Sequence, residues 1–236
     1  MPNFSLINVS LYVGSLAIYP FINKASLKIS AAALDATTFQ TTHQVRLGGL
    51  KQIEYQEDGF WDSVPDLATF SIVGTANQAV TVSPEGLELK TAYLFQAGAF
   101  TYEQFGQVGD VVPCSISMMG TNGVGVVRGQ MAAVNRTVSA TGQLGSVVTI
   151  TGPTATQYLY ATFHVQTAAT TITVLLESAP TFGFAAPVTR ATIGPLTTTG
   201  GTFMTRVAGP ITDGFYRFNV SAITGTFLVT GAIAVQ

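Results

Sequence analysis

The sequence of 236 residues contains few charged residues. Aspartate, glutamate, lysine and arginine make up 9% of it, against roughly 25% in ordinary soluble domains. Water solvates such a surface poorly unless hydroxyl groups or protein partners cover it. Threonine, which favours strands, supplies hydroxyl groups, since it occupies 23 of the 100 positions from 137 to 236. We expect either partner surfaces that cover the remainder or a threonine-rich β-sandwich that stays monomeric.

Cysteine and histidine are also scarce, which limits the available chemistry. The single cysteine, Cys114, excludes an intrachain disulfide and a cysteine-based metal cluster, and it suits a reducing compartment. Its alternating surroundings, VVPCSISMM, predict a buried thiol. His43 and His164 lack the spacing of a metal site, and we interpret them as a turn residue and a strand residue. From the sequence we therefore expect a protein that is not an enzyme and has no catalytic residues, no cofactor and no bound metal.

Basic clusters and long apolar runs are missing as well. No cluster of lysine and arginine with interleaved aromatic residues occurs, so ordinary nucleic-acid binding is not expected. Polar residues and Pro20 interrupt the apolar N-terminal stretch, and the first positive charge is Lys24. We expect neither a membrane span nor a signal peptide, and a chain that is cytosolic when synthesised.

The few charges are unevenly distributed. The net charge is −2, but residues 35–110 hold ten acids and three bases, and thus −7, while the remainder carries +5. A chain with an acidic central segment and basic flanks can be steered head to tail against copies of itself. The ten acids are Asp35, Glu54, Glu57, Asp58, Asp62, Asp66, Glu85, Glu88, Glu103 and Asp110.

Alternation with period two dominates the chain and predicts roughly a dozen strands, hence a mainly β fold. One short helix is expected from about Val64 to Val73, because Ser63 suits the N-cap and Gly74 the end. The glycine-rich GTNGVGVVRG lacks the lysine of a phosphate loop. We expect a hairpin turn around Asn122 and Gly123 instead.

Two local features allow functional interpretations. Acids cluster at Glu54, Glu57, Asp58 and Asp62, but the spacing of a calcium loop is absent, and a solvated face is the preferred interpretation over a divalent-cation site or a glycosidase pair. Phe60 and Trp61 could stack on a sugar. An aromatic anchor at the rim of a core is the more common role of such a pair.

The stretch LDATTFQTTHQVRLGGL, from Leu34 to Leu50, separates two predicted strands. It shows almost no apolar periodicity and is too long for a hairpin turn. Connections of this length in compact domains are usually functional or disordered. Its only charges are Asp35 and Arg46, so much of it could be buried against a partner without stranding many ions.

Several short motifs follow one another along the chain. The segment LDATTFQTTHQVRLGGLKQIEYQEDGFWD is followed by VGDVVPCSIS, VVRGQM, YLYATFHV and GPITDGFYR. This ordered set resembles the pattern of the major tail proteins, or tail tube proteins, of long-tailed (siphovirus-type) bacteriophages, above all those of actinobacteria. The matching residues of the first segment are Asp35, Thr37, Thr38, Phe39, Gly49, Leu50, Gly59, Phe60, Trp61 and Asp62.

The resemblance implies a tail-tube-type β-sandwich with one short helix and a long inter-subunit loop. Six copies would form a ring whose sheets close into a continuous β-barrel lumen, and rings would stack into the tube that conducts the tape measure protein and the genome. Implied partners are other copies, the tape measure protein, the tail terminator, and baseplate or distal tail proteins, with DNA in transit only. The implied location is the virion tail, assembled in the host cytoplasm. The inter-subunit loop would include Asp35, Thr37, Thr38, Phe39, His43 and Arg46.

A channel for DNA should not bind phosphates, so its wall should be acidic. In KQIEYQEDGF, alternation places Glu54, Gln56 and Asp58 on one side of a strand. These three residues are the primary candidates for the lumen lining, and Glu103 and Asp110 are secondary ones.

We expect a tube domain with an N-terminal arm over residues 1–135 and a threonine-rich β continuation or outer sandwich over 136–236. The alternatives to a tube subunit are another virion protein, such as a head decoration or minor tail protein, and a carbohydrate-binding β module.

Overall fold

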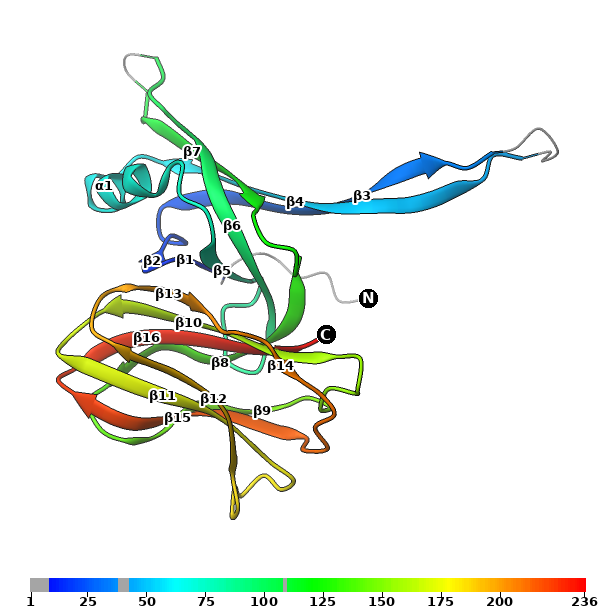
Figure 1. The fold of residues 1–236 in the computed structure, drawn as a ribbon. Coiled ribbons are helices and arrows are strands. Elements are labelled where there is room, and N and C mark those ends of the chain that lie inside the picture. Colours follow the sequence, from blue (N-terminus) through cyan, green and yellow to red (C-terminus); the bar gives the residue numbers. More distant parts are fainter. Residues whose placement is uncertain (1–8, 38–42, 108–109) are drawn as a thin grey trace. The chain divides into compact units, whose positions relative to one another are not determined.

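The structure is a computed structural model that describes residues 9–37, 43–107 and 110–236. Within these residues it contains sixteen strands and one helix (Figure 1), which confirms the predicted mainly β fold. The chain divides into two compact units. Unit 1 comprises the described residues of 1–20, 78–96 and 127–236, and unit 2 comprises those of 21–77 and 97–126.

Unit 1 contains two sheets. The first has the strand order β13-β10-β16-β8-β6-β5-β1-β2, with β14 also paired to β10, and the second has the order β12-β11-β15-β9. The first sheet uses β1 (Ser10–Val13), β2 (Leu16–Ala17), β5 (Gln78–Ser83), the first part of β6 (Thr91–Gln104), β8 (Val127–Val138), β10 (Tyr158–Thr167), β13 (Gly200–Phe203), β14 (Val207–Ala208) and β16 (Phe227–Val235). The second uses β9 (Gly142–Thr149), β11 (Thr171–Ala179), β12 (Val188–Leu196) and β15 (Phe215–Thr224).

Alternating apolar side chains from both sheets form the core of unit 1. Phe163 of β10 and Phe218 of β15 meet edge to face, with ring centroids 5.5 Å apart. Leu176, Val229 and Ile233 belong to the same fully buried cluster. Each such side chain contributes roughly 1.5–3 kcal/mol through burial. Unit 1 is therefore a β-sandwich with inner faces that interdigitate.

Unit 2 is a four-stranded antiparallel sheet with one helix. Its strand order is β3 (Ile22–Asp35), β4 (Arg46–Phe60), β7 (Pro113–Gly120) and the second part of β6. β4 pairs with β7 only from Glu54 to Phe60. Beyond Glu54, β3 and β4 continue as a two-stranded hairpin that extends away from the rest of this sheet (Figure 1). We call residues 30–37 and 43–52 the outer hairpin.

Helix α1 (Ser63–Ile72) confirms the predicted helix. Its first turn carries Asp66, which interacts favourably with the helix dipole. Gly74 follows the helix with a φ of +82°, a conformation that glycine adopts without strain. No helix among the described residues is long and apolar enough to cross a membrane.

The connection from 35 to 49 differs from the predicted loop. β3 extends to Asp35 and β4 begins at Arg46, and the two strands stay paired through a register shift between Ala31 and Ala33. Apolar alternation arises where one face of a strand is buried. Both faces of the outer hairpin are largely exposed, so the sequence there lacks the pattern by which strands are recognised.

Two further expectations are corrected. The predicted boundary near residue 135 falls inside β8, and the strands β1 and β2 belong to the same unit as the C-terminal residues. The change in composition at this point is therefore not a change of unit. Asn122 and Gly123 lie in a turn, but not in a hairpin, because β7 pairs with β4 and β6 whereas β8 pairs with β6 and β16.

Candidate assembly surface

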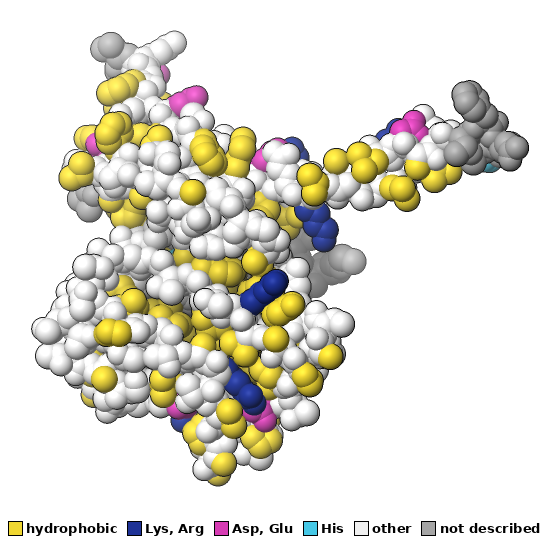
Figure 2. All heavy atoms as spheres, viewed as in Figure 1, with side chains coloured by type: hydrophobic (Ala, Val, Ile, Leu, Met, Phe, Trp, Pro, Cys, Tyr) yellow, Lys and Arg dark blue, Asp and Glu magenta, His cyan; other side chains and the backbone are white. Residues whose placement is uncertain are grey.

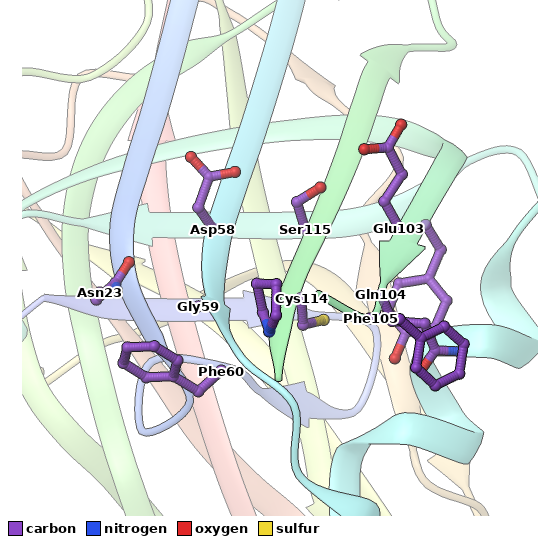
Figure 3. A pocket seen from close by; sticks show the side chains of 11 residues that line it. Asn23, Asp58, Gly59, Phe60, Glu103, Gln104, Phe105, Cys114 and Ser115 are labelled. Carbon is purple, nitrogen blue, oxygen red and sulfur yellow. The ribbon is translucent and has the colours of Figure 1, made fainter. Parts of the chain in front are cut away.

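Four of the five predicted lumen residues lie on one face of the unit 2 sheet. Glu54, Gln56 and Asp58 alternate along β4, Asp58 is opposite Ser115 of β7, and Ser115 is opposite Glu103 of β6. Directly opposite residues of paired strands share a face. Figure 3 shows the side chains of Asp58, Ser115 and Glu103 pointing the same way. We call this surface the polar face.

Two lysines of β3, which the sequence interpretation missed, also lie on the polar face. Lys24 Nζ is 3.0 Å from Asp58 Oδ2, and Lys28 Nζ is 2.8 Å from Glu54 Oε2. The hydrogen bond from Lys24 lowers the pKa of Asp58. The alternation of Lys24, Ser26 and Lys28 indicates that the three side chains share one side of a strand. Only the register between β3 and β4 shows that the two lysines lie beside the acids of β4. The polar face is thus less acidic than β4 alone suggested.

The opposite face of the sheet is buried. Ile53, Tyr55 and Glu57 point to it, as the alternation of β4 predicts. The Tyr55 hydroxyl donates a hydrogen bond to Glu57 Oε1, while Glu57 Oε2 has no partner among the described residues. Burial raises the pKa of Glu57 to about 7. The acids of β4 therefore do not converge on one site, since Glu57 faces away from Glu54 and Asp58.

His164 and Cys114, which were interpreted as a strand residue and a core thiol, both lie where burial disfavours their charged forms. His164 is buried in unit 1, where Nδ1 is 2.8 Å from the Gly14 carbonyl oxygen and Nε2 is 2.8 Å from Thr81 Oγ1. Burial lowers its pKa to about 4, so the ring is neutral at physiological pH. Cys114 is partly exposed, not fully buried as expected, and burial raises its pKa, which disfavours the nucleophilic thiolate.

No metal cluster is found in residues 9–37, 43–107 and 110–236: none of their histidine, cysteine, aspartate and glutamate side chains form a group of three that could hold an ion.

Four of the six predicted inter-subunit residues lie at or just beyond the paired ends of β3 and β4, namely Asp35, Thr37, His43 and Arg46. Asp35 is paired with Arg46 in the register of β3 and β4. The Thr37 backbone N–H and hydroxyl both donate to Asp35 Oδ1, and these bonds lower the pKa of Asp35. His43 is exposed and lies in a bend shortly before β4. Thr38 and Phe39 lie outside the described residues.

Apolar side chains of the hairpin are open to solvent. Leu34 and Leu47 are directly opposite each other and are 54% and 57% exposed. Leu50 is 89% exposed, and Ile29, which directly precedes the outer hairpin, is 53% exposed. Figure 2 shows hydrophobic side chains along the length of the hairpin. Two-stranded hairpins are marginally stable in water without a surface to pack on, so this segment is suited to contact a partner.

Phe60 and Trp61 are not buried in a core of this chain. They are 50% and 40% exposed. Phe60 has the same parity in β4 as Asp58, which directs its side chain to the polar face, and Trp61 follows the end of the strand. Gly59 allows the backbone of Phe21 to lie close to β4, because a Cβ at position 59 would be 2.2 Å from the Phe21 carbonyl oxygen.

A groove of about 770 Å³ lies at the end of the unit 2 sheet (Figure 3). The apolar rings of Phe60 and Phe105 line the groove together with the polar side chains of Asp58, Glu103 and Ser115. Asp110, the fifth predicted lumen residue, is exposed in the connection between β6 and β7. It is not on a strand of the polar face.

Comparisons with known proteins give distant structural similarities. No family model and no curated protein matches the sequence. A chain of the virion of a native gene transfer agent particle is 12% identical, with a TM-score of 0.41, over 52% of this chain and 95% of that one. A chain from the tail of the empty particle, which has C6 symmetry, is 11% identical with a TM-score of 0.38 over 43% and 78%.

The Dit protein of phage SPP1, described as a hub adsorption apparatus protein, is 10% identical with a TM-score of 0.37 over 97% of this chain and 99% of that one. Similarity at these TM-scores does not establish a common fold.

Proposed function

We propose that this chain is a structural protein of a bacteriophage tail, and that it forms the tail tube. The ordered motifs from Asp35 to Asp62 and beyond, which resemble those of major tail proteins, support the proposal. The structural observation that carries it is the outer hairpin, which exposes Leu34, Leu47 and Leu50 to solvent. Contact with another copy would shield these side chains, at roughly 25 cal/mol for each Å² of apolar surface removed from water.

The unit 2 sheet supports ring formation. Its edges, β3 and the second part of β6, run in opposite directions, because the sheet has four antiparallel strands. Joining the β6 edge of one copy to the β3 edge of the next would continue the antiparallel pairing. A closed ring of such sheets would have no exposed edges. Six copies and a continuous barrel are the arrangement that the resemblance implies.

The polar face is the proposed wall of the channel. Glu54, Asp58 and Glu103 face Lys24 and Lys28 there, so each copy carries three carboxylates against two ammonium groups. A mildly acidic wall in which both lysines are paired would repel DNA phosphates weakly and bind few of them. DNA and the tape measure protein would pass through, while terminator and baseplate proteins would contact the tube ends in the virion.

Electron microscopy of the concentrated protein tests the proposal. The wild-type chain should form hollow tubes, and a variant with residues 31–51 replaced by Asn-Gly should not. Ser30 and Gln52 are opposite each other, so a two-residue turn can close the shortened hairpin and leave the remainder folded.

A variant of unchanged length, Leu34→Ser with Leu47→Ser and Leu50→Ser, should also lose tubes. Phe182→Ser removes an exposed apolar side chain of unit 1 and is the matched control, which should assemble normally. Tubes from the shortened variant would contradict the role of the outer hairpin. Isolated rings from the wild type would indicate a ring-forming tail component other than the tube, and monomers that bind glycans would favour a carbohydrate-binding module.

A further inference from the structure

The two edges of the unit 2 sheet carry opposite charges in the same cross-strand row. Lys24 of β3 is opposite Asp58 of β4, Asp58 is opposite Ser115 of β7, and Ser115 is opposite Glu103 of β6. The row therefore begins with an ammonium group at one edge and ends with a carboxylate at the other. Both groups are on the polar face.

Glu103 is the unpaired member of this row. It is exposed, and it makes no ion pair with a described residue, in contrast to Glu54 and Asp58. The side chain of Lys24 is 69% exposed, and its ammonium group forms an ion pair with Asp58 Oδ2. Because an ammonium group has three N–H donors, Lys24 can bind a second carboxylate without releasing Asp58.

The backbone is available for pairing along β3 and along the part of β6 that follows Ala99, which itself forms a bridge with Val73. β3 pairs only with β4, and within the described residues of unit 2, Thr101–Gln104 of β6 pair only with β7. Phe100 and Phe105, which flank this part of β6, are 52% and 77% exposed. Open edges of this kind favour the addition of another strand.

We propose that the β6 edge of one copy pairs with the β3 edge of a second copy, and that Glu103 binds Lys24 of that second copy and thereby sets the register. The inference rests on the proposed function and names the charges that would close the ring. A slip of two residues in either direction would place Glu103 beside Ile22 or Ser26, neither of which has a charge. Opposite charges directly across paired strands are favourable, and like charges are unfavourable.

Charge reversal tests the pairing, with the critical concentration for assembly measured by sedimentation and electron microscopy. Glu103→Lys should raise this concentration at least tenfold, because two lysines would then meet. Lys24→Glu, combined with Asp58→Asn to avoid repulsion within the chain, should have a similar effect. All three substitutions together should return the critical concentration to within about threefold of the wild type. Asp110→Lys, which makes the same charge change on an exposed residue outside the row, is the control and should assemble normally.

The outcomes separate the inference from the proposed function. Wild-type protein that never forms rings or tubes would overturn the proposed function. If wild-type tubes form and Glu103→Lys assembles equally well, the inference is wrong while the proposed function stands. Rescue of Glu103→Lys by Lys28→Glu with Glu54→Gln, and not by the Lys24 combination, would overturn the proposed register. Thermal unfolding of the unassembled variants checks that each remains folded.

Discussion

Unit 1 and unit 2 are both antiparallel β structures, but they differ in how many large apolar side chains they leave exposed to solvent. Among the described residues, fifteen of the nineteen large hydrophobic side chains that are exposed lie in unit 2, although it is the smaller unit. Unit 1 has two sheets that bury each other's inner faces, as Phe163 and Phe218 show. Unit 2 has one sheet, one helix and a long hairpin, which cannot cover all of their own apolar surface.

The buried acids of the two units differ in the same way. Glu177 of unit 1 is 2.8 Å from Arg217 Nε and accepts a hydrogen bond from Asn219. Glu57 of unit 2 is as deeply buried, but its hydrogen-bonding partner is the neutral Tyr55. Among the residues that the structure describes, the buried polar side-chain atoms of unit 1 all have hydrogen-bond partners, whereas Glu57 Oε2 of unit 2 has none.

The largest expected difference between the two units is the loss of stability when an aromatic side chain is removed. Phe218→Ala in unit 1 should lower the free energy of unfolding by about 3–5 kcal/mol, because it leaves a cavity between the sheets. Phe70→Ala on α1 of unit 2, where the ring is 64% exposed, should change it by less than about 0.5 kcal/mol. Urea unfolding of unassembled protein measures both. Equal losses would show that Phe70 is packed and that the contrast between the units is false.

A second difference concerns pH. The pKa of Glu57 is raised in the folded state to about 7, so between about pH 4.5 and 7 the Glu57 carboxyl binds a proton in the folded chain that it releases in the unfolded chain. Its contribution to stability is therefore present at low pH and is lost as the pH rises through 7. A shift of this size corresponds to about 3 kcal/mol.

Glu57→Gln should remove that loss, so the variant should gain stability relative to the wild type between pH 5 and pH 8 in urea unfolding. Cys114 and Tyr55 do not obscure this range, because burial raises the pKa of both. Glu177→Gln is the control for a paired acid and should destabilise the protein at pH 8. The same pH profile for wild type and Glu57→Gln would show that Glu57 is not the group that titrates.

The smallest expected difference concerns the ion pairs. Arg217→Met leaves the buried Glu177 carboxylate without its cation and should cost about 3 kcal/mol. Lys28→Met removes the exposed partner of Glu54 and should cost less than about 1 kcal/mol, an effect that added salt reduces further. Chemical unfolding at low and high salt measures both, and a large cost for Lys28→Met would contradict an exposed polar face in the unassembled chain.

Local sequence patterns correctly predicted several elements. The alternation of β4 separates Glu54, Gln56 and Asp58 from Ile53, Tyr55 and Glu57, because side chains of any strand alternate between its faces. Helix α1 was predicted within one residue at each end from Ser63 and Gly74, although Ser63 is already helical and the Asp62 carbonyl oxygen accepts the first hydrogen bond, from the Asp66 N–H. These predictions succeeded because their physical causes lie within a few residues.

Predictions that depended on distant residues were less successful. The outer hairpin was expected to be a loop, because strands with two exposed faces need no apolar alternation. Phe60 and Trp61 were expected at the rim of a core; they are 50% and 40% exposed, and only the strand β4 shows that the position of Phe60 directs its ring to the polar face. Neither the pairing of Lys24 with Asp58 nor the solitary position of Glu103 could be read from the chain, since both depend on the register of separate strands.

By itself, the sequence determined a mainly β chain with few charges and one short helix, because composition and alternation act locally. The tertiary structure decided which strands are neighbours, and therefore that Lys24 and Glu103 lie at opposite edges of one row while Glu57 is buried on the other face. The physical reason is that register is fixed by hydrogen bonds and packing between segments far apart in the chain, and no single segment encodes it.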